Sequence, residues 1–245
     1  MAKKSKPKKA VKAKKAPKAA KKKAPAAKKA TKKPAKVKAV KKAGKRAAPV
    51  KAKPAKAVDL KTQVEKLEQK IQNDKKSLTE LRKKLPLQEV ADYTFKTHDG
   101  VEIKLSEMFG EFKDLVLVHN MGKGCPYCTL WADGFIGLVK HLENRAAFVV
   151  ISKDKPEVQR DFYQGRGWNF KMYSSHESTF NRDMNFESEN GGQWPGVSGF
   201  TKDESGKIYR TGYTYFGPGD DFCAVWPMLD LLQEGPAGWE PKFQY

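Results

Sequence analysis

The sequence predicts an α/β domain with a mixed sheet over residues 87–245, preceded by a helix at residues 57–86 and a basic tail at residues 1–56. Three observations support this fold class. Apolar runs of strand length alternate with helical patterns in the first half of the domain, and a hairpin pattern with a last helix follows. The domain is also long enough to bury one sizeable core.

The tail is a polycation. It contains 24 Lys, Arg46 and six prolines, and it has no acidic or aromatic residue and no Leu, Ile or Phe. Such a segment has nothing to bury against the entropy of ordering, so we expect it to be disordered. Of the 49 basic residues in the chain, 25 lie in the tail. Residues 57–245 contain the other 24 and all 28 acidic residues, so they carry a net charge of about −4.

Closely spaced lysines neutralise phosphates and release counterions, so the tail predicts nucleic-acid binding that depends on salt and not on base sequence. In composition it resembles the tails of linker histones and the basic extensions of some bacterial nucleoid proteins. The alternative left open is a solubilising or membrane-surface arm, although no lipidation motif or apolar anchor accompanies it. The residues expected to contact phosphates are Lys3, Lys4, Lys8, Lys9, Lys14, Lys15, Lys21, Lys22, Lys23, Lys28, Lys29, Lys32, Lys33, Lys41, Lys42, Lys45 and Arg46.

The cellular compartment is predicted from what the sequence does not show. The basic start is not followed by the apolar segment of a signal peptide, and no apolar run reaches transmembrane length. We therefore expect a cytoplasmic, nucleoid-associated protein, or a nuclear one in a eukaryotic host, with no membrane partner. Three cysteines in a reducing compartment favour catalysis over a framework of structural disulfides.

The helix before the domain has an apolar stripe that ends at Pro86. The stripe follows the 4-3 spacing of a coiled coil, with Asp74 at the one position where the pattern lapses. It leaves two alternatives open, a homodimer through residues 60–85 or docking on the domain that follows. The apolar residues of the stripe are Leu60, Val64, Leu67, Ile71, Leu78, Leu81 and Leu85.

The elements of the domain follow from the periodicity of its apolar residues. In the helix that begins near Cys128, we expect Trp131, Phe135, Leu138 and Leu142 to share one buried face. The other expected elements, in order, are a hairpin of residues 93–95 and 101–105, a buried strand at 115–119, a second at 147–151, a helix at 156–165, a short strand at 168–173, a hairpin of 197–200 and 207–215, and a last helix at 221–232.

The motif at residues 125–128, Cys125-Pro126-Tyr127-Cys128, lies where a buried strand gives way to a helix. Two thiols three residues apart at a helix start can close a disulfide, and the helix N-terminus favours the thiolate of Cys125. The chemistry expected of this arrangement is thiol–disulfide exchange, with Cys125 as nucleophile and Cys128 as resolving thiol.

Two other uses of a Cys-x-x-Cys pair fit less well. A closed zinc site needs four ligands, and the chain adds only Cys223 and four scattered histidines. Haem attachment needs His after the second cysteine, where Thr129 stands. We therefore expect no metal and no cofactor. The four histidines are His98, His119, His141 and His176.

Several stretches around the motif resemble a largely bacterial thioredoxin-like family related to the AhpC/TSA peroxiredoxins. The resemblance covers roughly residues 78–245 and implies a thioredoxin-like fold with a peroxiredoxin-like N-terminal extension. The longer insert that the family often carries before its CxxC is reduced here to Gly122 and Lys123. The matching stretches are residues 78–86, 105–109, 115–121, 124–135, 195–198 and 209–215.

The resemblance also implies the residues that support the dithiol. Pro126 and Tyr127 lie between the cysteines. Pro195 takes the place of the cis-proline of thioredoxin-like folds, where neighbouring backbone groups, here those of Trp194 and Gly196, bind an extended substrate. Cys223 is a candidate third thiol, although a lone cysteine near the last helix is more often a small buried apolar residue.

The function expected from these residues is that of a thiol–disulfide oxidoreductase acting on protein or small-molecule disulfides and tethered to nucleic acid by its tail. One alternative is a peroxiredoxin-like hydroperoxide reductase, but the Thr of the peroxiredoxin motif is replaced here by Gly122. The Cys-Pro-Tyr-Cys sequence is also similar to that of glutaredoxins, which leaves a glutathione-linked reaction open. A non-enzymatic alternative is a nucleoid or chromatin protein in which the dithiol is idle.

Overall fold

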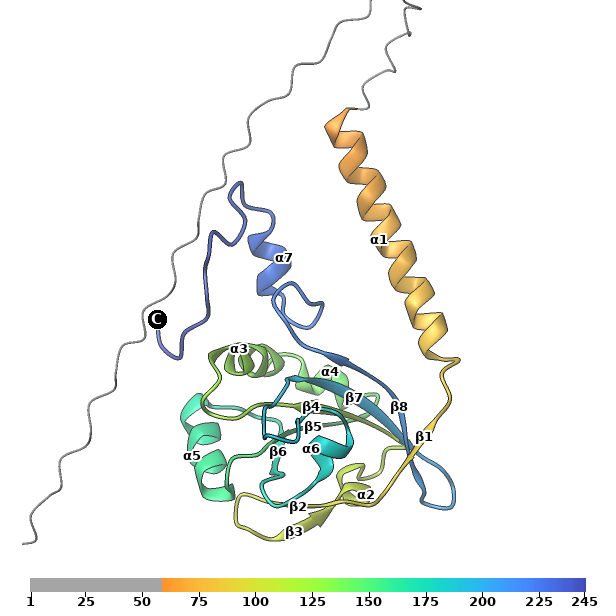
Figure 1. The fold of residues 1–245 in the computed structure, drawn as a ribbon, viewed down its shortest axis with the longest axis vertical. Helices are drawn as coiled ribbons and strands as arrows, with labels where there is room; N and C mark the ends of the chain where they lie inside the picture. Colours follow the sequence, from red (N-terminus) through yellow and green to blue (C-terminus); the bar gives the residue numbers. More distant parts are fainter. Residues whose placement is uncertain (1–58) are drawn as a thin grey trace, which may run out of the picture. The chain divides into compact units, whose positions relative to one another are not determined.

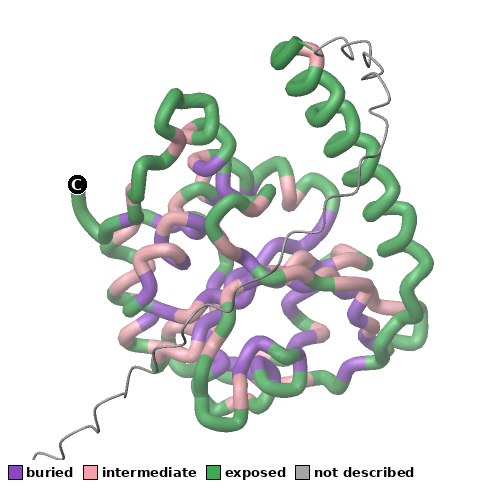
Figure 2. The backbone as a smooth tube through the Cα atoms, turned by 45° about the horizontal axis from the view of Figure 1, so that its top comes forward, coloured by how far each residue is buried: buried purple, intermediate pink, exposed green. Residues whose placement is uncertain are grey.

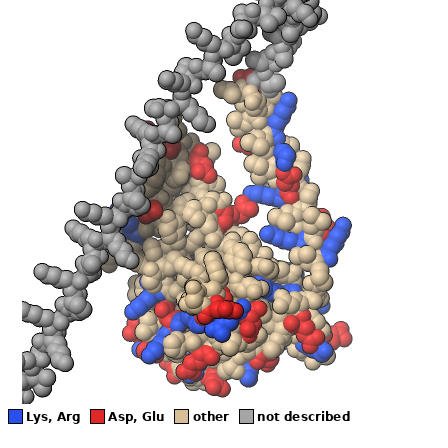
Figure 3. All heavy atoms as spheres, viewed as in Figure 1, with Lys and Arg blue, Asp and Glu red and all other residues tan. Residues whose placement is uncertain are grey.

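The structure, a computed structural model, describes residues 59–245. The basic tail, with every lysine expected to contact phosphate, lies outside the described residues. Residues 57–245 form one compact unit. Figure 3 shows acidic and basic side chains interspersed over the visible face of this unit, in keeping with its small net charge. None of the helices in the described part of the chain has both the length and the hydropathy that a membrane crossing requires.

One eight-stranded mixed sheet organises the domain, in the order β1-β8-β7-β4-β5-β6-β2-β3 (Figure 1). Its centre is a set of parallel strands, β4–β5–β6, and β7 and β8 join the β4 edge antiparallel. The strands are β1 (Gln88–Val90), β2 (Thr94–Lys96), β3 (Glu102–Lys104), β4 (Asp114–His119), β5 (Ala147–Ser152), β6 (Lys171–Ser174), β7 (Gly196–Lys202) and β8 (Ile208–Tyr215).

Two buried clusters of side chains lie on the two faces of the sheet. Along β4, Leu115 and Leu117 point into one cluster and Val118 into the other, as the period of two in a strand requires. Figure 2 shows the buried residues concentrated in the interior of the domain. The helices are α1 (Leu60–Arg82), α2 (Leu105–Met108), α3 (Pro126–Phe135), α4 (Val139–Leu142), α5 (Pro156–Arg166), α6 (Phe180–Asp183) and α7 (Val225–Leu229).

The order of elements is that of the thioredoxin fold. A parallel β4–α3–β5 unit is followed by the antiparallel β7–β8 hairpin and then by α7, and α3, α5 and α7 all contribute to the same buried cluster. The additional β2–β3 hairpin extends the sheet beyond β6, and β1 pairs with β8 at the opposite edge. The expected α/β thioredoxin-like fold is confirmed, and β1, α2, α4 and α6 are elements that the periodicity did not predict.

Two helix predictions are wrong in extent. The helix after the CxxC ends at Phe135, and Leu138 is 48% exposed; Trp131 and Phe135 are buried in the core as expected. The last helix is only α7, five residues long, instead of residues 221–232. Pro227 explains this, because in a helix that began at residue 221 its ring would clash with the carbonyl one turn earlier.

Two other boundaries also differ from the expected ones. β6 begins at Lys171, so Trp168 and Phe170 belong to the core but precede the strand. α1 ends at Arg82, four residues before Pro86, with Lys83 as its C-cap. No residue of α1 is buried.

Candidate active site

Cys125 is the N-cap residue of α3, and Pro126 occupies the first turn. Proline is well suited there because the first backbone N–H groups of a helix have no partner within the helix. The backbone N–H of Cys128 donates to the Cys125 sulfur at 3.0 Å, so the sulfur acts as the capping acceptor. Both thiols are free and buried, with Cys125 8% and Cys128 2% exposed.

The two thiols differ in acidity. A hydrogen bond from the Cys128 thiol lowers the pKa of Cys125 to about 7, against burial, and the backbone N–H groups of Cys128 and Tyr127 lower it further. The same hydrogen bond, together with burial, raises the pKa of Cys128 far above its ordinary value. The geometry therefore favours one thiolate, on Cys125, with its proton donor one turn further along α3.

Two polar side chains that were not predicted hold the loop between β4 and α3. Asn120 accepts the backbone N–H of Gly122 at 2.7 Å, and its amide donates to the carbonyl of Cys128 at 3.2 Å. Asp154 accepts the backbone N–H of Lys123 at 2.8 Å. These residues follow the neighbouring parallel strands β4 and β5, so their common position at one sheet edge is the signal that could have identified them.

Gly122 is required by this loop geometry. Its φ is +93°, and a Cβ at this position would lie 2.5 Å from the Asp154 carboxylate oxygen. Gly124, two residues on, has space around it and no positive φ. Substituting Gly122 and Gly124 in turn therefore distinguishes the effect of the loop geometry at Gly122 from the effect of losing any glycine in this loop.

We expect Gly122→Ala to slow the alkylation of Cys125 and to lower the free energy of unfolding by about 1–3 kcal/mol, because the backbone strain and the Asp154 contact shift the loop. Gly124→Ala is the matched control and should change both quantities little. The measurements are the rate of iodoacetamide labelling and the urea midpoint. Equal effects of the two substitutions would show that Gly122 has no special role.

Tyr127 connects the motif to the C-terminal part of the domain. Its ring stacks on Trp226 of α7 with a centroid distance of 6.2 Å, and Trp226 in turn contacts Trp239. Burial, followed by the nearby charge of Glu240, raises the pKa of Tyr127. The residues after β8 thus support the start of α3.

The segment 194–196 lies beside the motif loop, because Gly196 pairs with His119 in the β4–β7 register. The expected cis-proline is absent: residues 59–245 contain no cis peptide bond, so Pro195 is trans. The Trp194 N–H donates to the carbonyl of Phe186, and the Pro195 carbonyl accepts the N–H of Phe216. The N–H of Trp194 is therefore already paired within the domain, and the docking of an extended substrate at residues 194–196 stays a prediction.

Cys223 and His119, two other residues considered from the sequence, are both buried. Cys223 belongs to the core cluster with Trp131 and Trp226, and burial raises its pKa, as expected of a small apolar core residue. His119 is 1% exposed, stacks on Phe186 and hydrogen-bonds Ser198. Burial, with the charge of Arg210, holds the pKa of His119 well below its ordinary value, so it remains neutral.

The fold and this motif define a thioredoxin-like protein with a closely spaced pair of cysteines, Cys125 and Cys128. A family model described as a bacterial protein of unknown function (DUF899) matches residues 57–241, and the chain belongs to this DUF899 family. No curated protein sequence matches the chain.

Several solved structures are similar to parts of the chain. Peroxidoxin BcpB from Mycobacterium tuberculosis is 23% identical over 50% of this chain and 80% of its own, with a TM-score of 0.42. Reduced Prx3 from Vibrio vulnificus, in complex with H2O2, is 17% identical over 56% of this chain and 90% of its own, with a TM-score of 0.44. A peroxiredoxin-like protein from Aquifex aeolicus is 18% identical over 54% of this chain and 76% of its own, with a TM-score of 0.41.

Proposed function

We propose that the domain is a thiol–disulfide oxidoreductase with Cys125 as nucleophile and Cys128 as resolving thiol. The observation that carries this proposal is the position of the Cys125 sulfur at the N-cap of α3, where it accepts the Cys128 N–H at 3.0 Å, and the opposite directions of the two pKa shifts agree with it. A thiol with a pKa of about 7 is close to half ionised at neutral pH, which is near the optimum for an attacking thiolate. The Cys128 thiol stays protonated until Cys125 has attacked the substrate.

The reaction has two displacement steps. The Cys125 thiolate attacks one sulfur of a substrate disulfide, a mixed disulfide forms, and the other substrate sulfur leaves as a thiolate that takes up a proton. Cys128 then loses its proton and attacks the Cys125 sulfur, which releases the second substrate thiol. The substrate gains two electrons, Cys125 and Cys128 become a disulfide, and an external dithiol must reduce that disulfide before the next turnover.

A hydroperoxide is the second candidate substrate, and the low exposure of Cys125 favours it, because a small oxidant reaches a buried sulfur more easily than a protein disulfide does. Thiolate attack on the peroxide oxygen would give a sulfenic acid and water or an alcohol, and Cys128 would then displace water to form the disulfide. Two observations disfavour a hydroperoxide substrate. Gly122 has no hydroxyl in the place of the peroxiredoxin Thr, and the Thr129 hydroxyl already donates to the carbonyl of Cys125.

One experiment tests the proposal and separates the two substrates. The reduced full chain is supplied with dithiothreitol and either a small aromatic disulfide or hydrogen peroxide, and the turnover of each is measured. We expect catalysed reduction of the disulfide to exceed that of the peroxide. Faster peroxide turnover would replace the main proposal with the second, and no turnover of either would favour the idle dithiol of a structural protein.

We further propose that residues 1–56 tether the domain to nucleic acid. The support is the charge of the sequence, with 25 basic and no acidic residues in this segment against a net charge of about −4 for the rest of the chain. Because such binding requires only phosphates, it would place the domain near nucleic acid without selecting a sequence.

A further inference from the structure

The apolar stripe of α1 lies on the surface. Every residue of the helix is exposed except Thr62, which is half-buried, and Figure 2 shows the same pattern along the helix. The leucines at three positions of the stripe, Leu60, Leu67 and Leu81, are 76%, 59% and 62% exposed. A helix of 23 residues owes most of its stability to packing of its apolar face, so this face needs a partner.

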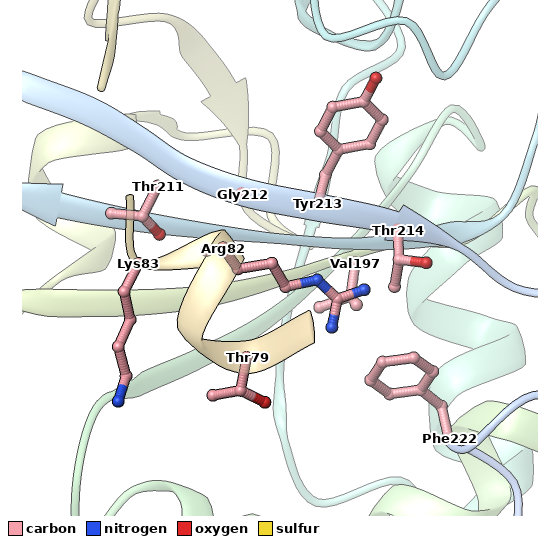
Figure 4. A pocket seen from close by; sticks show the side chains of 10 residues that line it. Thr79, Arg82, Lys83, Val197, Thr211, Gly212, Tyr213, Thr214 and Phe222 are labelled. Atoms are coloured by element: carbon pink, nitrogen blue, oxygen red, sulfur yellow. The ribbon is translucent and has the colours of Figure 1, made fainter. Parts of the chain in front are cut away.

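The domain approaches the C-terminal half of α1. Lys75 forms an ion pair with Asp221 at 2.6 Å, and a groove of about 480 Å³ runs between α1 and the segment after β8. Ile71 and Leu78 line this groove from the α1 side, and Phe222 from the other. A neighbouring hollow, shown in Figure 4, lies between the end of α1 and strands β7 and β8. Ile71 and Leu78 belong to the stripe, but they remain 44% and 45% exposed, so the groove leaves them largely uncovered.

The stripe, from Leu60 to Leu85, is symmetric about its own midpoint between Gln72 and Asn73. A second α1 laid antiparallel over this point places Leu81 of the partner subunit opposite Val64, and Leu78 of the partner subunit opposite Leu67. Ile71 then lies opposite Asp74 of the partner subunit, and by symmetry this layer occurs twice at the centre. Such layers are the a–d contacts of an antiparallel coiled coil, and polar residues at the centre of the seam fix register at a cost in stability.

Charge favours the antiparallel orientation. A parallel pair would place Lys70 beside Lys75 of the partner subunit and would bring two segments of charge +25 to the same end of the helices. The antiparallel pair places Glu68 beside Lys75 of the partner subunit instead. Its one unfavourable flanking contact is Lys61 with Arg82 of the partner subunit. The two basic segments would begin roughly 35 Å apart, at opposite ends of the helix pair.

The basic tail of the same chain is a poor occupant for this surface, because it has no Leu, Ile, Phe or aromatic residue to place against the stripe. We infer that the occupant is a second copy of the chain, and that the protein is a dimer held by an antiparallel pair of α1 helices. This inference does not depend on the redox chemistry proposed for Cys125 and Cys128.

Sedimentation of the full chain tests the dimer. We expect a mass twice the 27.6 kDa of one chain, and a monomer for Leu67→Glu, which puts a carboxylate into an apolar layer. Gln69→Glu adds the same charge on the outward face of the helix and should remain a dimer. A monomeric parent chain, or equal masses for the two variants, would overturn the inference. Neither position is in the domain core, so folding can be checked by tryptophan emission.

Cysteine cross-linking tests the orientation, in a background with Ser at positions 125 and 128. The double variant Leu67→Cys, Leu78→Cys should form a covalent dimer on oxidation, because these positions face each other in the antiparallel pair. Leu67→Cys alone should not, since the two copies of residue 67 would lie about 16 Å apart along the helix axis, beyond disulfide reach. Cross-linking of the single variant would show a parallel pair and overturn the proposed orientation.

Discussion

Cys125→Ser should reduce disulfide turnover by roughly a thousandfold or more, because it removes the only thiol of the pair whose pKa lies near neutrality. Cys128→Ser should also stop turnover, but it should leave the first attack intact. The expected product of that variant is a stable mixed disulfide at residue 125, which intact-mass spectrometry detects. The two variants therefore separate attack from resolution.

Cys223→Ala is the control for these substitutions. Its thiol is buried in the core cluster and its pKa is raised, so turnover should stay close to that of the parent chain even if the free energy of unfolding falls. Loss of turnover in this variant alone, with the fold intact, would show that Cys223 takes part in the exchange. Retained turnover in Cys125→Ser would contradict the assignment of the nucleophile.

Removal of residues 1–56 should abolish the binding of random duplex DNA. For the full chain, 6–10 phosphate contacts would lower the affinity by about 10³–10⁵-fold between 50 and 200 mM salt. Fluorescence anisotropy with a labelled duplex of arbitrary sequence measures both effects. The turnover of a small disulfide should be nearly the same with and without the tail, because the proposed tether sets the position of the domain and not its conformation.

Two results would contradict the tether. If residues 57–245 still bind DNA with similar affinity, the nucleic-acid surface lies on the folded domain. If truncation lowers the turnover of a small disulfide, the tail contributes to the active site. A weak salt dependence of the full chain would argue against binding through phosphates.

The fold was predictable from sequence where local pattern and packing agree. The runs that became β4 and β5 are apolar because both faces of the central sheet are covered, whereas β7 and β8 alternate between buried and more exposed residues. The motif at residues 125–128 lies directly after β4, at the start of α3. Local pattern failed where one residue overrides it. Pro227 shortens the last helix, and the helix after Cys128 ends at Phe135 although apolar residues continue with helical spacing.

The site was predictable only in part, because its support comes from distant segments. Asp154 reaches the motif loop from the end of the next strand, and Trp226 reaches Tyr127 from α7. The positions of Asp154 and Trp226 in the sequence do not mark either of them as a site residue. The backbone of Trp194 is paired with that of Phe186, a contact that the motif at residues 194–196 does not reveal. For α1, the periodicity predicted the helix, while its exposure became apparent only in three dimensions.

The most direct test of the central claim is the pH dependence of Cys125 alkylation in the reduced full chain. The thiolate is the reactive form, so the rate should rise with pH and level off with a midpoint near pH 7. Peptide mapping should show Cys125 labelled before Cys128, whose thiolate is disfavoured across this range. A midpoint near the ordinary thiol value of about 8.5, or earlier labelling of Cys128, would contradict the assignment of Cys125 as the activated nucleophile.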